Sequence, residues 1–154
     1  MAASTSKTIL LEVNGSERPI FEKLVASAAV TPGDLLAVTA TVTPLASAGA
    51  VNQRAFALEN PYAPDPTATA ISQDYSVGDS CRYVFAQAGD LIYANIAASQ
   101  TVSIGSQLIA TSTGGQLGTT TVDASTLAGA LVGIAEEAVT TGGAETAHCK
   151  VRIV

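Results

Sequence analysis

A short unit recurs along this chain and limits the folds open to it: a glycine-containing turn followed by a run of strand-forming residues. It reads TPGDLLAVT from Thr31, SVGDSCRYV from Ser76, QAGDLIYAN from Gln87 and SIGSQLIAT from Ser103. Glycine tolerates a positive φ, and the Asp or Ser after it can bond to nearby backbone, so each unit predicts a turn. The Leu, Ile, Val and Tyr that follow suit a half-buried strand. The chain is therefore predicted to be a series of turns and short strands, too irregular for a solenoid.

Strands are also predicted outside these units. They are expected at residues 8–13, 35–43, 52–58, 131–140 and 147–154. Asn14-Gly15 is a strong hairpin signal, with residues 16–21 returning antiparallel as an edge strand because they contain Pro19. Residues 22–30 are ambiguous between a short helix and an extended chain.

Residues 59–75 contain Pro61, Pro64 and Pro66 and show no periodicity, which predicts a long loop of a kind that is often functional. No segment shows a sustained helical period. We therefore predict an all-β fold, a compact β-barrel or β-sandwich of short strands with a flexible N-terminal arm and one long Pro-rich loop. Residues 1–30 are assigned to the arm and an edge hairpin, and residues 31–154 to a single β-rich domain.

The composition argues for contact with other proteins. Only 13% of residues are charged, against about 25% in an average globular chain. A surface of small, uncharged residues is easily buried against other subunits. The net charge of −6 and the seven scattered basic residues argue against a nucleic-acid partner. The start lacks the pattern of a signal peptide and the longest apolar run has nine residues, so we expect no membrane partner and synthesis in a cytoplasm.

No residue pattern predicts catalysis, a metal or a cofactor. His148 and Cys149 are adjacent in a predicted strand and should point to opposite faces, and the same holds for Glu136 and Glu137. The Asp residues of the turns are single carboxylates in separate loops, unlike a calcium loop. Neither Cys81 nor Cys149 is part of a CxxC motif. Because free cysteines are often buried, we expect both to be buried thiols, with a disulfide between them as the alternative. We expect a protein that is not an enzyme.

Three passages together resemble the capsid decoration, or cement, proteins of tailed bacteriophages. They are KTILLEVNGSERPIFEKLVASAAVTPGDLLAV at 7–38, QRAFALENPYA at 53–63 and YSVGDSCRYVFAQAGDLIYANIAASQTVSIGSQLIATSTGGQL at 75–117. A C-terminal strand pair, LVGIAEEAV and KVRIV, follows them in the same order. The similarity covers most of the chain and includes no catalytic or metal-binding motif.

The resemblance implies a structural virion protein on the outer surface of the expanded icosahedral capsid. Such a protein would stabilise the head by bridging neighbouring major capsid protein subunits, and it would be a homotrimer, with a dimer as the alternative. An edge strand can add to a neighbouring sheet, and a long loop can reach a neighbour. The expected capsid-contact residues are Lys7, Thr8, Ile9, Leu10, Leu11, Glu12, Val13, Arg18, Glu59, Asn60, Pro61 and Tyr62.

Two other functions remain open from the sequence. One is a tail or fibre component of the same virion, which composition does not separate from a head protein. The other is a carbohydrate-binding β-sandwich, for which Tyr62 is the evident exposed aromatic residue in a chain without tryptophan.

Overall fold

The chain is described by a computed structural model for residues 8–13, 20–46, 54–62, 69–119 and 131–154. These residues contain strands and loops and no helix, which confirms the all-β prediction. The strands are β1 (Leu10–Glu12), β2 (Ile20–Val25), β3 (Leu35–Val38), β4 (Val42–Pro44), β5 (Ala55–Ala57), β6 (Ser80–Phe85), β7 (Leu91–Ile96), β8 (Thr101–Val102), β9 (Gln107–Ala110), β10 (Leu117–Thr119), β11 (Leu131–Ala135), β12 (Val139–Thr140) and β13 (Ala147–Ile153).

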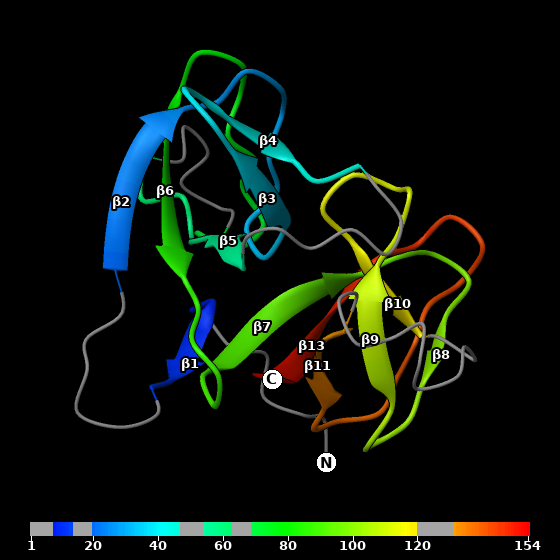
Figure 1. Ribbon diagram of the computed structural model, residues 1–154. Helices are drawn as coiled ribbons and strands as arrows, with labels where there is room; N and C mark the ends of the chain where they lie inside the picture. The colour runs from blue at the N-terminus through cyan, green and yellow to red at the C-terminus, as the bar shows by residue number, and fades with distance from the viewer. Residues whose placement is uncertain (1–7, 14–19, 47–53, 63–68, 120–130) are drawn as a thin grey trace.

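Five strands close into a small barrel in the order β7-β10-β9-β11-β13, because β13 pairs again with β7. That last pairing is antiparallel and extends from Ala147 opposite Ile96 to Arg152 opposite Leu91. The short strand β1 adds to β7 on the other side, and β8 with β12 forms a two-stranded ribbon beside the barrel (Figure 1). The predicted barrel is therefore confirmed.

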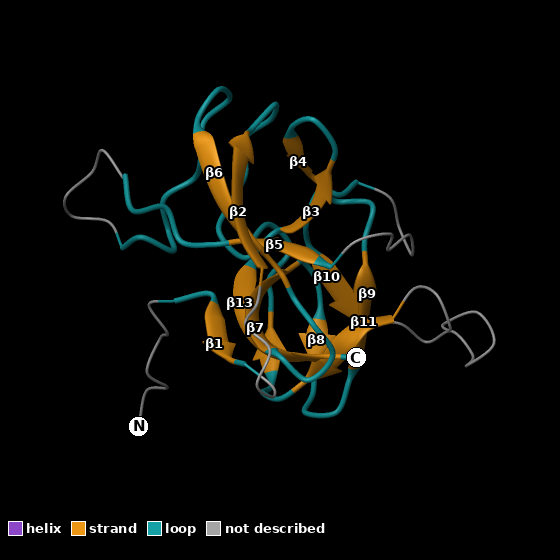
Figure 2. Cartoon of the chain, turned by 60° about the vertical axis from the view of Figure 1, so that its left-hand side comes forward, coloured by secondary structure: helices purple, strands orange, loops and turns teal. Residues whose placement is uncertain are grey.

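The other five strands form a second sheet in the order β2-β6-β5-β3-β4. A parallel bridge between Ala26 and Val42 joins its two edges at one end. Figure 2 shows this sheet standing over the barrel, with β5 nearest to it. β2 lies at the outer edge of the molecule (Figure 1).

One hydrophobic core joins the two parts. Leu35, Phe56 and Val84 of the second sheet belong to the same buried cluster as Ile92 and Ile96 of the barrel. A smaller cluster lies inside the second sheet and includes Tyr75, Cys81 and Tyr83. The second sheet therefore encloses one cluster by itself and shares the larger one with the barrel.

The four predicted turns are confirmed in detail. The N–H groups of Thr31, Ser76 and Gln87 donate to the Oδ2 atoms of the aspartates three residues later, at 2.8–2.9 Å. Ser103 N–H donates in the same way to Ser106 Oγ at 3.0 Å. The glycine within each of these turns has a φ of 89–93°, the value that the third residue of a type II turn requires.

Three local predictions need correction. β1 pairs with β7 and β2 pairs with β6, so these strands are not the two arms of a hairpin, and Asn14-Gly15 itself lies outside the described residues. The single strand expected at 35–43 is a hairpin of β3 and β4, which turns where Thr39 N–H donates to the Thr41 carbonyl. Pro44 ends β4 at a sheet edge, where its missing N–H is tolerated. The strand expected at 131–140 is β11 followed by β12, which pair with different strands.

The other predicted strands are found with small shifts at their ends, and residues 22–25 of the ambiguous segment continue β2. Cys81 and Cys149 are buried in β6 and β13 as free thiols, as expected. Across the described ranges, we find no helix with the length and apolar character that crossing a membrane requires.

Candidate functional site

The two segments predicted to contact a partner lie side by side in the structure. Ile9 N–H donates a hydrogen bond to Glu59 Oε2 at 3.2 Å, and Tyr93 N–H donates to the Ile9 carbonyl at 2.7 Å. The N-terminal segment is thus held between β7 and the start of the Pro-rich loop. Residues far apart in the sequence therefore contribute to one surface.

The N-terminal segment is only partly available for contacts. Ile9 is fully buried in the main core, which corrects its assignment as a contact side chain. Ile9 lies just before β1, and the next residue, Leu10, is half-buried against the same core. Thr8, Glu12 and Val13 are exposed and Leu11 is half-buried. Lys7 and Arg18 lie outside the described residues.

Hydrogen bonds fix the start of the Pro-rich loop. Tyr75 O–H donates to the carbonyls of Leu58 and Glu59, at 3.1 and 2.9 Å. Asn60 is 3% exposed, so it holds the loop and is not itself a contact side chain. Its Nδ2 donates to the Asp74 carbonyl and its Oδ1 accepts from Tyr62 N–H.

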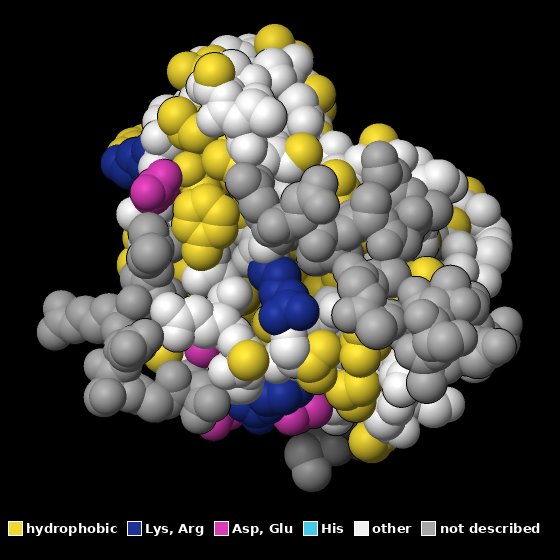
Figure 3. All heavy atoms as spheres, viewed as in Figure 1, with side chains coloured by type: hydrophobic (Ala, Val, Ile, Leu, Met, Phe, Trp, Pro, Cys, Tyr) yellow, Lys and Arg dark blue, Asp and Glu magenta, His cyan; other side chains and the backbone are white. Residues whose placement is uncertain are grey.

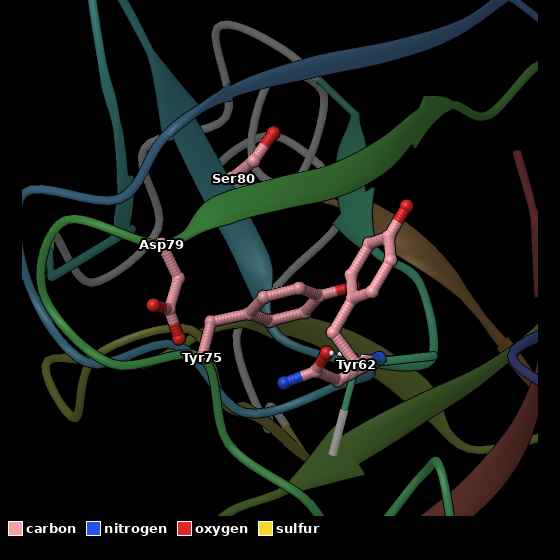
Figure 4. A pocket seen from close by; sticks show the side chains of 5 residues that line it. Tyr62, Tyr75, Asp79 and Ser80 are labelled. Carbon is pink, nitrogen blue, oxygen red and sulfur yellow. Dashed lines mark hydrogen bonds between the residues drawn. The ribbon is translucent and has the colours of Figure 1, made fainter. Parts of the chain in front are cut away.

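These bonds present Tyr62 to the solvent with 70% of its surface exposed, next to the exposed Pro61. A pocket of about 240 Å³ lies beside it, lined by Asn60, Tyr62, Tyr75, Asp79 and Ser80. Figure 4 shows the Tyr62 ring close to the hydroxyl end of Tyr75, with Ser80 across β6 from them. Because Asn60, Tyr75 and one Asp79 oxygen are already bonded within the fold, the pocket offers mainly an aromatic contact surface.

A second exposed surface lies on β2 and β6, and the sequence prediction missed it. Phe21 is 55% exposed and Val25 is 50% exposed, and both lie on the outer face of β2 with Lys23 between them. Arg82 on β6 stands directly opposite Lys23. A hollow of about 260 Å³ lies here, lined by Phe21, Glu22, Lys23, Leu58 and Arg82. The alternation in IFEKLV was the available signal, but this segment was ambiguous without its pairing partner.

The groups that might suggest catalysis are held in structural roles. Burial raises the pKa of the Cys81 thiol to about 12 and that of the Cys149 thiol to about 11, so both are protonated near neutral pH. Burial lowers the pKa of His148, whose Nε2 lies 2.8 Å from the Pro32 carbonyl oxygen and whose ring stacks on Tyr93. A neutral imidazole donating to that carbonyl ties β13 to the first turn.

Glu136 and Glu137 lie in the bend between β11 and β12 instead of in a strand, and they bond to different partners. Glu136 pairs with Arg152, whose Nε lies 2.7 Å from Glu136 Oε1, and this bond lowers the pKa of Glu136. Glu137 accepts a hydrogen bond from Lys150 N–H instead. Across the described residues, no group of three or more His, Cys, Asp or Glu side chains could hold a metal ion.

The visible surface is poor in charge. Figure 3 shows a few separate patches of basic and acidic side chains among hydrophobic and uncharged ones. Such a surface suits contacts with protein better than contacts with a charged polymer.

The comparisons with known proteins agree with this fold. A solved structure with a similar fold is the N base of the head fibre protein gp8.5 of bacteriophage phi29, with a TM-score of 0.52 and 16% sequence identity. The similarity covers 87% of this chain and 94% of that one. This chain has the fold of the phi29 fibre base. No protein-family model and no curated protein matches the sequence.

Proposed function

We propose that this chain is a structural protein of a bacteriophage head, which binds the outer surface of the expanded capsid and bridges neighbouring major capsid protein subunits. The observation that carries the proposal is the fold shared with the phi29 head-fibre base over nearly the whole of both chains. The resemblance of three passages to capsid decoration proteins points to the same location on a virion.

The proposed capsid contacts are the exposed parts of the predicted segments. These are Thr8 before β1, Glu12 and Val13 at its end, and Pro61 and Tyr62 on the loop. The hydrogen bond between Ile9 and Glu59 holds the two segments together, so they form one surface that can contact a single partner. A homotrimer presenting three such surfaces gains affinity from simultaneous contacts, provided that the capsid sites are correctly spaced.

Co-sedimentation with capsids of the parent phage tests the proposal. Purified protein is mixed with unexpanded and with expanded shells, and the bound fraction is measured against concentration. We expect saturable binding to expanded shells at a fixed ratio to the capsid protein, because only the expanded lattice presents the correct spacing. Absence of binding to both kinds of shell would overturn the proposal.

The phi29 neighbour also favours a second candidate function, the base of a fibre attached to the head. Immunogold labelling of intact virions separates a head position from a tail position. A head label whose density extends outward as a fibre would favour the fibre base, and a label on the tail would refute both candidates.

A further inference from the structure

Two positive charges face each other on the outer face of the second sheet. Lys23 on β2 stands directly opposite Arg82 on β6, and like charges in this position repel. Within the described part of the chain, neither forms an ion pair, whereas Lys150 and Arg152 both do. Such a pair is unexpected in a chain with a net charge of −6. It is a suitable partner for a carboxylate from another molecule.

Glu22 borders the same hollow but is already bonded. Glu22 is exposed, and its Oε2 accepts a hydrogen bond from Tyr83 O–H at 2.7 Å. The hollow beside Lys23 and Arg82 is otherwise lined by Phe21 and Leu58. It therefore combines positive charge with apolar walls.

Among the described residues, the outer edge of β2 has no strand partner at Phe21 and Lys23, whereas its Val25 end adjoins the bridge between Ala26 and Val42. Ala26 exchanges hydrogen bonds with Gly78 and Asp79 on the β6 side, donating to the Asp79 carbonyl and accepting from Gly78 N–H. Because backbone groups alternate along an antiparallel strand, those of Phe21, Lys23 and Val25 point away from β6. Among the described residues no strand pairs with this edge beyond the bridge at Ala26.

A second copy of the chain fits this edge poorly. Antiparallel pairing of two β2 strands that places Phe21 opposite Val25 also places Lys23 opposite Lys23, which is repulsive. The acidic residues within the described strands, Glu12 and Glu22, are already bonded to Arg152 and Tyr83. Strand addition by another copy through its described strands therefore brings no unbonded carboxylate to Lys23 and Arg82, which favours a segment of a different protein.

We infer that the free edge of β2 docks an extended segment of the major capsid protein by strand addition. An acidic residue of that segment would face Lys23 and Arg82. An apolar residue two positions from the acidic residue would face Phe21, because directly opposite residues share a face. The inference specifies which chemistry recognises the partner in the proposed capsid binding. It rests on the proposed function only for the source of the docked segment.

A peptide titration tests the recognition without the capsid. The probe is acetyl-Thr-Val-Thr-Glu-Thr-Val-Thr-amide, and its control carries Lys in place of Glu. We expect the probe to shift the NMR amide signals of Phe21, Lys23 and Val25, with binding about tenfold tighter than the control. Lys23→Glu should abolish this preference, because the introduced carboxylate faces and neutralises Arg82, and the same pairing should keep the variant folded. Equal binding of the two peptides, or shifts elsewhere on the molecule, would overturn the inference.

Capsid binding provides the second test, with a matched control. Lys23→Glu should bind expanded shells about tenfold more weakly than wild type. Lys150→Glu makes the same change of net charge on β13 and should bind as wild type. Equal loss or equal retention in the two variants would overturn the inference. Wild-type protein that binds the peptide but no shell would refute the proposed function and leave the docking edge standing.

Discussion

Single glycines set the positions at which this chain reverses direction. Each of the four repeated turns has a glycine with φ near 90°, which other residues rarely adopt. The residue after it, Asp or Ser, closes the turn by accepting a backbone hydrogen bond. The space around these glycines differs from turn to turn, so alanine substitutions at two of them should differ in their effect on stability.

Gly33→Ala should be much more damaging than Gly78→Ala. Both positions have a φ of +92°, so each substitution should cost about 1 kcal/mol in backbone strain. A Cβ at Gly78 meets no atom within 4 Å, whereas at Gly33 it would lie 2.9 Å from His148 Cδ2 and from the Tyr93 carbonyl oxygen. Overpacking should add about 2 kcal/mol to the cost at Gly33. Urea unfolding of both variants measures the difference, and equal losses would contradict the close approach.

Asp34 is a carboxyl group buried where the two sheets meet. Its Oδ1 accepts from Asn95 Nδ2 and its Oδ2 from Thr31 N–H. Burial nevertheless raises the pKa of Asp34 to about 6, since the two hydrogen bonds only partly offset the loss of hydration. The folded protein therefore keeps this proton at pH values where the unfolded chain, with a pKa near 3.8, has released it.

This raised pKa predicts that stability falls as pH rises from about 4 to about 6. Over this window the folded state binds more protons than the unfolded state, and the loss should total about 3 kcal/mol. Asp34→Asn has no titrating carboxyl group at this position. Its free energy of unfolding should therefore fall by about 3 kcal/mol less than that of the wild type over the same pH range. Urea unfolding of both proteins between pH 4 and 7 measures this, and parallel pH profiles would refute the raised pKa.

At the level of secondary-structure elements, β1 contributes both to the hydrophobic core and to the proposed contact surface. Ile9 just before it and Leu10 within it pack into the core that spans both sheets, while Glu12 and Val13 at its end are exposed on the proposed contact surface. Arg152 on β13 pairs with Glu12 at 3.3 Å, which ties this end to the barrel. The N-terminal contact segment is therefore also part of the fold.

Ile9→Ala should lower the free energy of unfolding by about 3 kcal/mol, because it removes a fully buried side chain and leaves a cavity. Val13→Ala is the matched control at a position that is 39% exposed, and it should cost about 0.5 kcal/mol or less. Denaturant unfolding measures both values. A small loss at Ile9 would mean that the segment is not anchored in the core.

At the scale of the whole molecule, the low surface charge favours association. We expect the purified protein to be a homotrimer, with a mass of three times 15.4 kDa in light scattering at micromolar concentration. A dimer mass would support the alternative oligomer. A monomer mass would contradict association in solution and restrict any oligomer to the capsid surface.

Local sequence is enough to predict the turns, the all-β class and most strand positions. These features depend on local constraints: glycine at positive φ, Asp or Ser closing the turn, and strand-forming residues after it. Tyr62 could also be expected on the surface, since it follows Pro61 in a segment without periodicity. A single residue and its near neighbours are enough to decide each of these.

Strand pairing, in contrast, depends on the complete fold. Barrel closure between β7 and β13, the separation of β1 from β2 and the burial of Ile9 all depend on contacts between distant segments. The facing pair of Lys23 and Arg82 arises in the same way, because strand register brings together residues that have no local relation. The physical reason is that a strand's sequence specifies its two faces, while its partner is chosen by the burial that the whole fold achieves.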